Sequence, residues 1–159
     1  MKLADFIVRK AVVPNLKAAD RNGAIRELVD TLAAVGTIAE EDVEAIARAA
    51  IQRENQGSTG FGKGVAVPHV KHQKIPRIMA TIGRSAVGID FAALDRAPVY
   101  TIVMLLSPPD NPDGHLQAME NIFRHLQRDN FRRFLRQSET AGAIMELIEE
   151  ADQLPSTGA

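Results

Sequence analysis

Residues 57–69 read GSTGFGKGVAVPH, which sets a glycine-rich loop and a short apolar run directly before a histidine. Glycine backbones reach positive φ and approach ligands closely, and their bare amide groups can form an anion-binding concavity, so this loop predicts a phosphate site. Residues 65–67 are typical of a short buried strand. Pro68 should end the pairing of that strand and keep Val67 extended, so we expect His69 at a strand end, fixed in position.

At such a position His69 can act as a nucleophile. An ordinary histidine pKa of about 6.5 leaves much of the imidazole neutral near pH 7, with one bare ring nitrogen. A phosphorylated imidazole stays reactive toward a second acceptor, so the residue can relay a phosphoryl group. The competing interpretation is a glycine-rich surface turn beside a structural histidine.

The same loop comes close to a nucleotide-binding P-loop but departs from it twice. Gly64 stands where that motif needs a Ser or Thr to bind magnesium. A P-loop must also open a helix, and residues 65–68, with two valines and a proline, cannot do so. We therefore do not expect nucleotide binding.

A longer segment, from Arg53-Glu54 through the glycine loop to Pro68-His69, resembles the active-site region of enzyme IIA domains of the fructose/mannitol class. These domains belong to the phosphoenolpyruvate-dependent phosphotransferase system, including its nitrogen-regulatory branch. The resemblance covers about residues 16–149, since further family features follow in order: Asp90-Phe91, Asp95, Pro98-Val99, an apolar strand and His115-Leu116.

The resemblance implies that His69 accepts phosphate from a small phosphocarrier protein, which makes the chain a phosphotransferase-system IIA component with a phosphohistidine intermediate. One departure concerns the next residue, which is usually small in the family and is Val70 here, followed by Lys71 and His72. Bulk at position 70 could narrow the access of the donor, but it does not remove the nucleophile.

Three further residues are expected to bind the phosphoryl oxygens. Arg53 should end a helix at the start of the loop, where its planar guanidinium fork suits an oxyanion. Ser58 and Thr59 could donate their hydroxyls. Without the resemblance, Arg53 would be a solvated charge at a helix end, and Ser58 and Thr59 would be ordinary turn residues.

His115 is the second histidine that the resemblance implies for the site. It falls in the first turn of an amphipathic helix whose apolar positions run from Leu116 to Leu126, and the helix dipole there opposes protonation of an imidazole. A neutral His115 could donate an N–H to a phosphoryl oxygen or hydrogen-bond His69. Without the resemblance it would be a surface histidine at a helix end.

His69, His72 and His115 also suggest a zinc site, but no fourth ligand is evident and we expect no metal.

The chain is expected to form one α/β domain over residues 1–150, a central mixed β-sheet flanked by helices, followed by a flexible tail over 151–159. Asp20 should cap a helix that ends near Gly36, and a second helix should end near Arg53. Strands are predicted over residues 77–84 and 99–106, the second one central, with a short edge strand around Ile89 and Phe91. Terminal helices should cover the sheet. Arginines near them could meet an acidic partner or simply be solvated: Arg124, Arg128, Arg132, Arg133 and Arg136.

Composition narrows the class of protein. The 159 residues are 45% hydrophobic, which supports one core, and a net charge of −1 offers no overall attraction to nucleic acid or to an anionic membrane. There is no cysteine, no signal-peptide core and no run of about 20 apolar residues that could span a bilayer. We expect a cytoplasmic protein that is not membrane-embedded and does not bind nucleic acid.

These observations favour a histidine phosphocarrier that needs no cofactor. Its acceptor is either the IIB component of a fructose/mannitol-type sugar transporter or, in a nitrogen-regulatory role, a regulated target protein. A chain without fused IIB or IIC segments favours the regulatory role. A third possibility is a regulatory binding module that is never phosphorylated.

Overall fold

A five-stranded mixed sheet forms the centre of the protein in the computed structural model, which describes residues 1–154. The predicted central strand is confirmed, because β5 pairs in parallel with β2 and β3 and antiparallel with β4. β1 extends the sheet as an antiparallel neighbour of β2. The strands are β1 (Gly60–Gly62), β2 (Val65–Ala66), β3 (His69–Lys71), β4 (Met79–Ile89) and β5 (Val99–Ser107).

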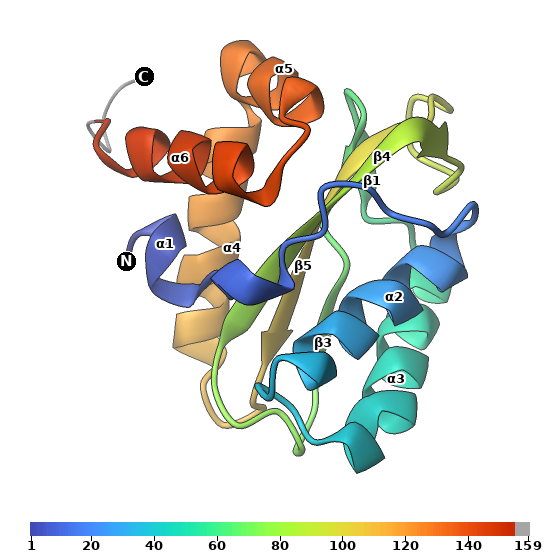
Figure 1. The fold of residues 1–159 in the computed structure, drawn as a ribbon. Coiled ribbons are helices and arrows are strands. Elements are labelled where there is room, and N and C mark those ends of the chain that lie inside the picture. Colours follow the sequence, from blue (N-terminus) through green and yellow to red (C-terminus); the bar gives the residue numbers. More distant parts are fainter. Residues whose placement is uncertain (155–159) are drawn as a thin grey trace.

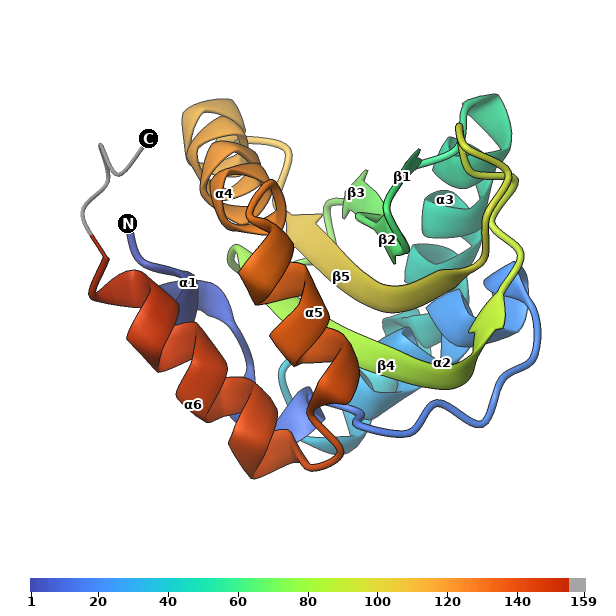
Figure 2. The same cartoon turned by 90° about the horizontal axis from the view of Figure 1, so that it is seen from above.

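Helices cover both faces of this sheet, as Figures 1 and 2 show. Alternation along β5 explains the two cores: Ile102, Met104 and Leu106 pack in the cluster under α2 and α3, whereas Val103 and Leu105 pack in the cluster under α4, α5 and α6. The helices are α1 (Leu3–Phe6), α2 (Arg21–Ala34), α3 (Val43–Gln56), α4 (Pro112–Leu126), α5 (Asp129–Gln137) and α6 (Ala141–Asp152), with 3-10 turns at Arg9–Ala11 and Glu40–Asp42.

The predicted helix boundaries hold for α2 and fall short for α3. Asp20 caps α2 by accepting a hydrogen bond of 2.6 Å from Gly23 N, and Gly36 follows the helix with φ +84°. α3 runs past Arg53 to Gln56. Its last turn buries Glu54, a residue that a hydrophobic pattern does not count as inward-facing.

Strand β4 is longer than predicted. It starts at Met79 and continues to Ile89, which pairs with Val99, so the expected separate edge strand is instead the irregular end of β4. Phe91 lies in the core, as expected.

The first helix, α1, and the end of the last helix, α6, lie side by side. The carboxylate of Asp152, the last residue of α6, accepts hydrogen bonds from Leu3 N at 2.8 Å and Ala4 N at 2.9 Å. Ala151 and Asp152 therefore belong to a helix, although we placed them in the tail, and residues 155–159 of that predicted tail lie outside the described part.

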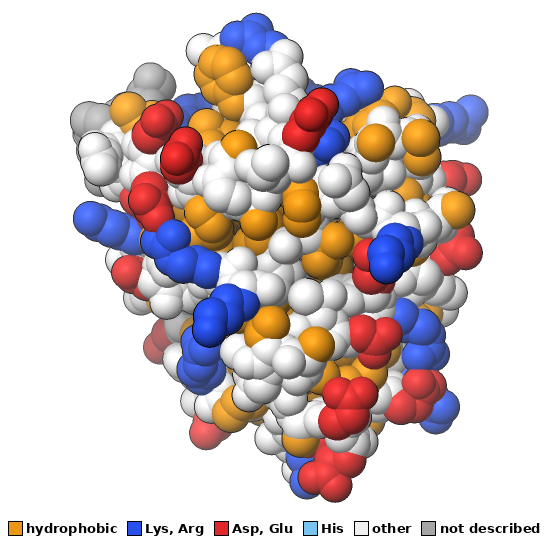
Figure 3. Space-filling model, viewed as in Figure 1, with side chains coloured by type: hydrophobic (Ala, Val, Ile, Leu, Met, Phe, Trp, Pro, Cys, Tyr) orange, Lys and Arg blue, Asp and Glu red, His pale blue; other side chains and the backbone are white. Residues whose placement is uncertain are grey.

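The surface carries mixed charge. On the face in Figure 3, acidic and basic side chains are interspersed over the helices, in keeping with the net charge of −1. No helix within residues 1–154 is long and apolar enough to cross a membrane.

Candidate functional site

The glycine loop forms a tight hairpin, and several of its amides have partners within the structure. Gly62 (φ +104°) and Gly64 (φ +79°) take the left-handed backbone that this hairpin requires. Gly60 N donates to Ser58 Oγ at 3.0 Å, and Lys63 N donates to Asp95 Oδ2 at 3.0 Å. These two N–H groups help to fold the loop and are not free for a phosphate, so whether the loop binds phosphate stays a prediction.

Ser58 and Thr59 are also engaged within the structure. Ser58 Oγ donates to the carbonyl of Phe91 at 2.6 Å. Thr59 donates twice to the Glu54 carboxylate, from N at 2.6 Å and from Oγ1 at 2.7 Å. Glu54 is only 2% exposed, so this pair fastens the start of the loop to α3. Neither Ser58 nor Thr59 lines the hollow beside His69.

His69, His115 and Arg53 do come together. They line one hollow of about 410 Å³, which we call the His69 hollow. α3 forms one wall, β3 the floor and the first turn of α4 the other wall. Its lining is Ala49, Gln52, Arg53, Gln56, His69, Val70, Lys71 and His115.

Gln52, Gln56 and Lys71 were missed by the sequence reasoning, although their spacing could have indicated them. Gln52 and Gln56 stand one helical turn apart, beside Arg53 on α3. Lys71 follows His69 by two residues in an extended strand, so both side chains point to the same face.

The backbone fixes the His69 ring in one tautomer. Nδ1 lies 2.9 Å from the carbonyl oxygen of Val67, and because a carbonyl can only accept, Nδ1 carries the proton. In the neutral ring Nε2 is then the bare nitrogen. His69 opens β3 opposite Leu105, so it stands at a strand end as predicted; Pro68, however, does not leave the sheet, since its carbonyl accepts a bond from Leu105 N.

The surroundings of His69 favour its neutral form. Burial lowers the pKa of His69 below its ordinary value, and the positive charges of Arg53 and Lys71 lower it further. The Val67 carbonyl and the Glu54 carboxylate oppose this shift. The net direction is downward, so the ring is mainly a free base near pH 7.

His115 faces His69 with its ring centroid 5.7 Å away. Its Nδ1 shares a hydrogen bond of 2.6 Å with the hydroxyl of Ser107, the buried last residue of β5. Burial, followed by the charges of Lys71 and His69, lowers the pKa of His115 to about 4. Asn111 caps α4 through Gly114 N at 3.1 Å and so fixes the turn that carries this neutral imidazole.

Val70 does not obstruct the hollow. It alternates with His69 and Lys71 along β3, so its side chain points inward, and it is 6% exposed within the core cluster under α2 and α3. The bulk at this position fills the core, and His69 still lines the hollow.

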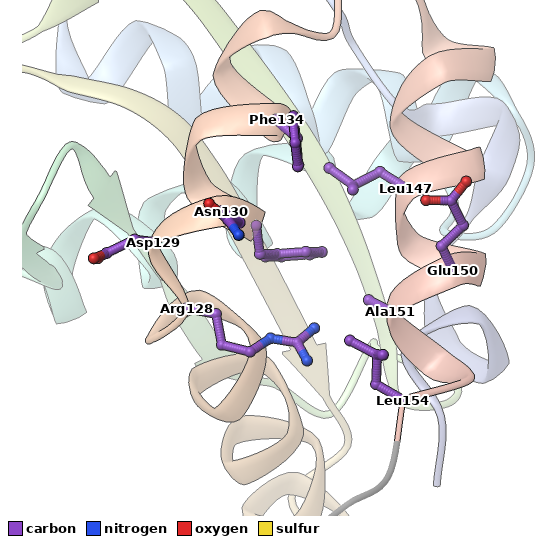
Figure 4. Close-up of a pocket in the computed structure, with 9 residues that line it drawn as sticks. Arg128, Asp129, Asn130, Phe134, Leu147, Glu150, Ala151 and Leu154 are labelled. Carbon is purple, nitrogen blue, oxygen red and sulfur yellow. The ribbon is translucent and has the colours of Figure 1, made fainter. Parts of the chain in front are cut away.

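A larger hollow of about 530 Å³ lies between α5 and α6 (Figure 4). Phe134, Leu147 and Leu154 contribute apolar walls, and Arg128 lies at one end, where it donates to Nδ1 of the buried His125 at 3.1 Å. No imidazole, thiol or hydroxyl occurs among the described side chains that line this hollow. The His69 hollow is therefore the better candidate for nucleophilic chemistry.

Residues 5–151 match the family described as phosphoenolpyruvate-dependent sugar phosphotransferase system, EIIA 2. The chain belongs to this family. Among relatives of this EIIA domain, a nitrogen regulatory protein of Bradyrhizobium diazoefficiens is 32% identical over 93% of the chain and 95% of its own length. A fructose-specific EIIA component of Haloferax volcanii is 31% identical over 83% of the chain and 84% of its own.

A third relative is longer. The fructose-specific EIIABC component of Bacillus subtilis is 29% identical over 96% of the chain, which spans only 24% of that protein.

Among solved structures, the nitrogen regulatory protein IIA-Ntr of Neisseria meningitidis superposes with a TM-score of 0.81 at 23% identity, covering 92% of this chain and 98% of that one. IIA mannitol of Escherichia coli gives 0.74 at 19% identity, covering 89% and 97%. These likenesses show that the fold is that of EIIA domains.

Proposed function

We propose that this EIIA domain is a histidine phosphocarrier that accepts a phosphoryl group on Nε2 of His69 and passes it on. One observation carries the proposal. The Val67 carbonyl accepts the hydrogen bond from Nδ1 of His69, so Nε2 is the bare nitrogen of the neutral ring, and the ring lines a hollow together with Arg53, Lys71 and His115. Nε2 of His69 is thus the atom that combines a free lone pair with positively charged neighbours that can bind a phosphoryl group.

The transfer balances without a cofactor. The lone pair of His69 Nε2 forms the bond to phosphorus while the bond between phosphorus and the donor breaks, and that electron pair leaves with the donor. The Nδ1 proton stays on the ring, where the Val67 carbonyl stabilises the positive charge that develops. In the second half of the cycle the N–P bond breaks toward the acceptor, and Nε2 regains its lone pair.

Arg53, Lys71 and His115 stabilise the transferred group. Arg53 donates through Nη1 to the Gly57 carbonyl at 2.9 Å, which holds its guanidinium at the end of α3 beside the hollow. When the Ser107 hydroxyl donates to His115 Nδ1, the single N–H of the neutral ring stands on Nε2 and can donate to a phosphoryl oxygen. Donors aligned in advance on a phosphoryl group are the main source of catalysis in such transfers.

The donor is a phosphocarrier protein of the phosphotransferase system, and the acceptor is a regulated target in a nitrogen-regulatory role. Similarity to nitrogen regulatory proteins over nearly their whole length supports this role. The second candidate acceptor is a IIB component. It is favoured by the fructose-specific relatives and by a structural neighbour, the complex of IIA mannitol with phosphorylated IIB mannitol of Escherichia coli, at a TM-score of 0.74 and 17% identity. Both roles would be carried out in the cytoplasm.

Intact mass after incubation with phosphoenolpyruvate, enzyme I and the phosphocarrier protein tests the proposal. We expect one added phosphoryl group on the wild type and none on His69→Ala. His72→Ala is the matched control, because that ring lies outside the hollow and accepts a bond from Lys74 N at 3.0 Å. Equal label on His69→Ala would refute the site, and an unlabelled wild type would favour a binding module that is never phosphorylated.

The acceptor can be identified with the same material. Phosphorylated protein mixed with a IIB component of the fructose or mannitol class should keep its label if the role is regulatory. Loss of label to IIB within the time of a single turnover would instead support the sugar-transport role.

A further inference from the structure

We propose that a second hollow, at the start of β5, binds a small dianion of the phosphate or phosphomonoester class. This Thr101 hollow has a volume of about 200 Å³, and the lining residues that matter are Lys63, Asp95, Tyr100, Thr101, Arg132 and Arg136. Thr101 and Leu105, the partner of His69, are four residues apart on β5, which places the two hollows about 13 Å apart along the strand. The inference does not depend on the proposed phosphotransfer.

The floor of the Thr101 hollow carries a hydroxyl-bearing side chain. Thr101 lines the hollow and is only 2% exposed, and its backbone N donates to the Gly64 carbonyl at 3.1 Å, which fixes its position. A hydroxyl can donate a hydrogen bond to an oxyanion. A ligand oxygen in the hollow would accept that bond.

One wall positions a guanidinium. Arg136, in the last turn of α5, lies over the Tyr100 ring with 3.5 Å between its Cζ and the ring centroid. In the described part of the chain its side chain forms no hydrogen bond and no ion pair with a carboxylate. Stacking fixes the plane of the guanidinium and leaves its N–H groups free for an oxyanion.

A buried charge beneath the hollow adds to its positive potential. Arg84 on β4 pairs directly with Thr101, so both side chains stand on the same face of the sheet. Arg84 is 8% exposed, yet its partners are neutral: the Arg136 carbonyl at 3.1 Å and Asn15 Oδ1 at 3.3 Å, while Nε has none in the described chain. A buried charge without a counterion is costly, and a bound anion would offset that cost.

The balance of charge favours a dianion. Arg132 is paired with Asp129, so the cations left without an acid are Lys63, Arg84 and Arg136. Against them stands Asp95, whose carboxylate is held by Lys63 N and by Ala97 N, each at 3.0 Å. The volume is below the 300–1,000 Å³ usual for drug-sized ligands, which fits inorganic phosphate or a small phosphomonoester.

The test is a titration of the ¹⁵N-labelled protein with inorganic phosphate and, separately, with glycerol 3-phosphate at constant ionic strength, followed by NMR. We expect saturable shifts at the amides of Gly64, Tyr100 and Thr101. Arg136→Gln and Thr101→Val should each weaken binding about tenfold or more, since each removes a hydrogen bond to a charged ligand. Arg133→Gln, an exposed arginine on the same helix, is the matched control and should bind normally.

Two further variants make the outcome decisive. His69→Ala should bind phosphate at the Thr101 hollow as the wild type does, which separates this inference from the phosphotransfer proposal. Arg84→Met should weaken binding while leaving the melting temperature of the phosphate-free protein equal or higher, because a buried unpaired charge is removed. Shifts confined to the His69 hollow, or unchanged affinity in Arg136→Gln, would overturn the inference.

Discussion

We propose that both hollows at the ends of β5 bind a phosphate-like anion, and they differ in the side chains that would surround it. The His69 hollow combines Arg53 and Lys71 with two imidazoles, whereas the Thr101 hollow combines Lys63 and Arg136 with a hydroxyl. Arginine and lysine side chains attract phosphate in both. Only the His69 hollow contains imidazoles, and at His69 the Val67 carbonyl holds the proton on Nδ1, so Nε2 is the bare nitrogen of the neutral ring that we propose as the nucleophile.

The chemical difference between the two hollows lies in the protonation of their side chains. The Val67 carbonyl takes the one proton of His69 and leaves a reactive lone pair. Thr101 offers only a hydroxyl, which keeps its proton and does not attack phosphorus unless a neighbouring base removes that proton. Positive charge therefore predicts where an anion binds. Whether a phosphoryl group can also be transferred depends on a neighbouring side chain with an unprotonated, nucleophilic atom.

Removing the second imidazole should have the largest effect on the His69 hollow after loss of the nucleophile itself. We expect His115→Ala to slow phosphoryl acceptance about 100-fold, as loss of one preorganised donor does in other enzymes. Rapid-quench measurement of labelled protein gives the rate. A variant that transfers as fast as the wild type would reduce His115 to a structural residue, and phosphate binding at the Thr101 hollow should be unchanged in either case.

Removing a cation from each hollow separates them further. Arg53→Gln should lower the rate of phosphoryl acceptance about tenfold, because it removes a charge-assisted hydrogen bond to the transferred group. Arg48→Gln serves as the control, an exposed arginine on the same helix that pairs with Glu44. Arg136→Gln should leave the rate unaltered. A slower Arg136→Gln would mean that the two hollows are coupled.

A change of pH should produce the smallest effect, and its sign follows from the shifts at the site. The pKa of His69 is lowered from its ordinary value near 6.5, so the ring stays a free base as the pH falls through that value. His115, with a pKa of about 4, also stays neutral. We expect acceptance at pH 6.0 to fall, relative to pH 7.5, by less than the roughly fourfold that an imidazole with the ordinary pKa near 6.5 would lose. A profile half-maximal at pH 6.5 or above would contradict the lowered pKa.

Much of the fold could be predicted because local patterns and the tertiary structure agree. Asp20 and Gly36 flank α2 as expected, and the apolar run over residues 99–106 is the central strand. α3 was predicted too short because its last turn turns Glu54 inward, and an apolar pattern cannot anticipate a buried carboxylate that fastens a loop.

The site was predictable in its histidines and less so in its loop. Resemblance to the family indicated His69, His115 and Arg53, which the structure brings to one hollow. The glycine loop suggested a phosphate cradle, but a sequence does not show that Lys63 N already donates to Asp95, a residue far along the chain. Whether Ser58 and Thr59 ever reach a phosphoryl group stays a prediction, and their present partners speak against it.

The position of the proton on the His69 ring is the most direct test of the account. Long-range ¹H–¹⁵N NMR of the protein labelled with ¹⁵N in its histidine rings reports both nitrogens before and after phosphorylation. We predict a neutral His69 with its proton on Nδ1 at pH 7, and phosphorus bonded to Nε2 after transfer. A proton on Nε2 in the resting protein, or phosphorus on Nδ1, would contradict it.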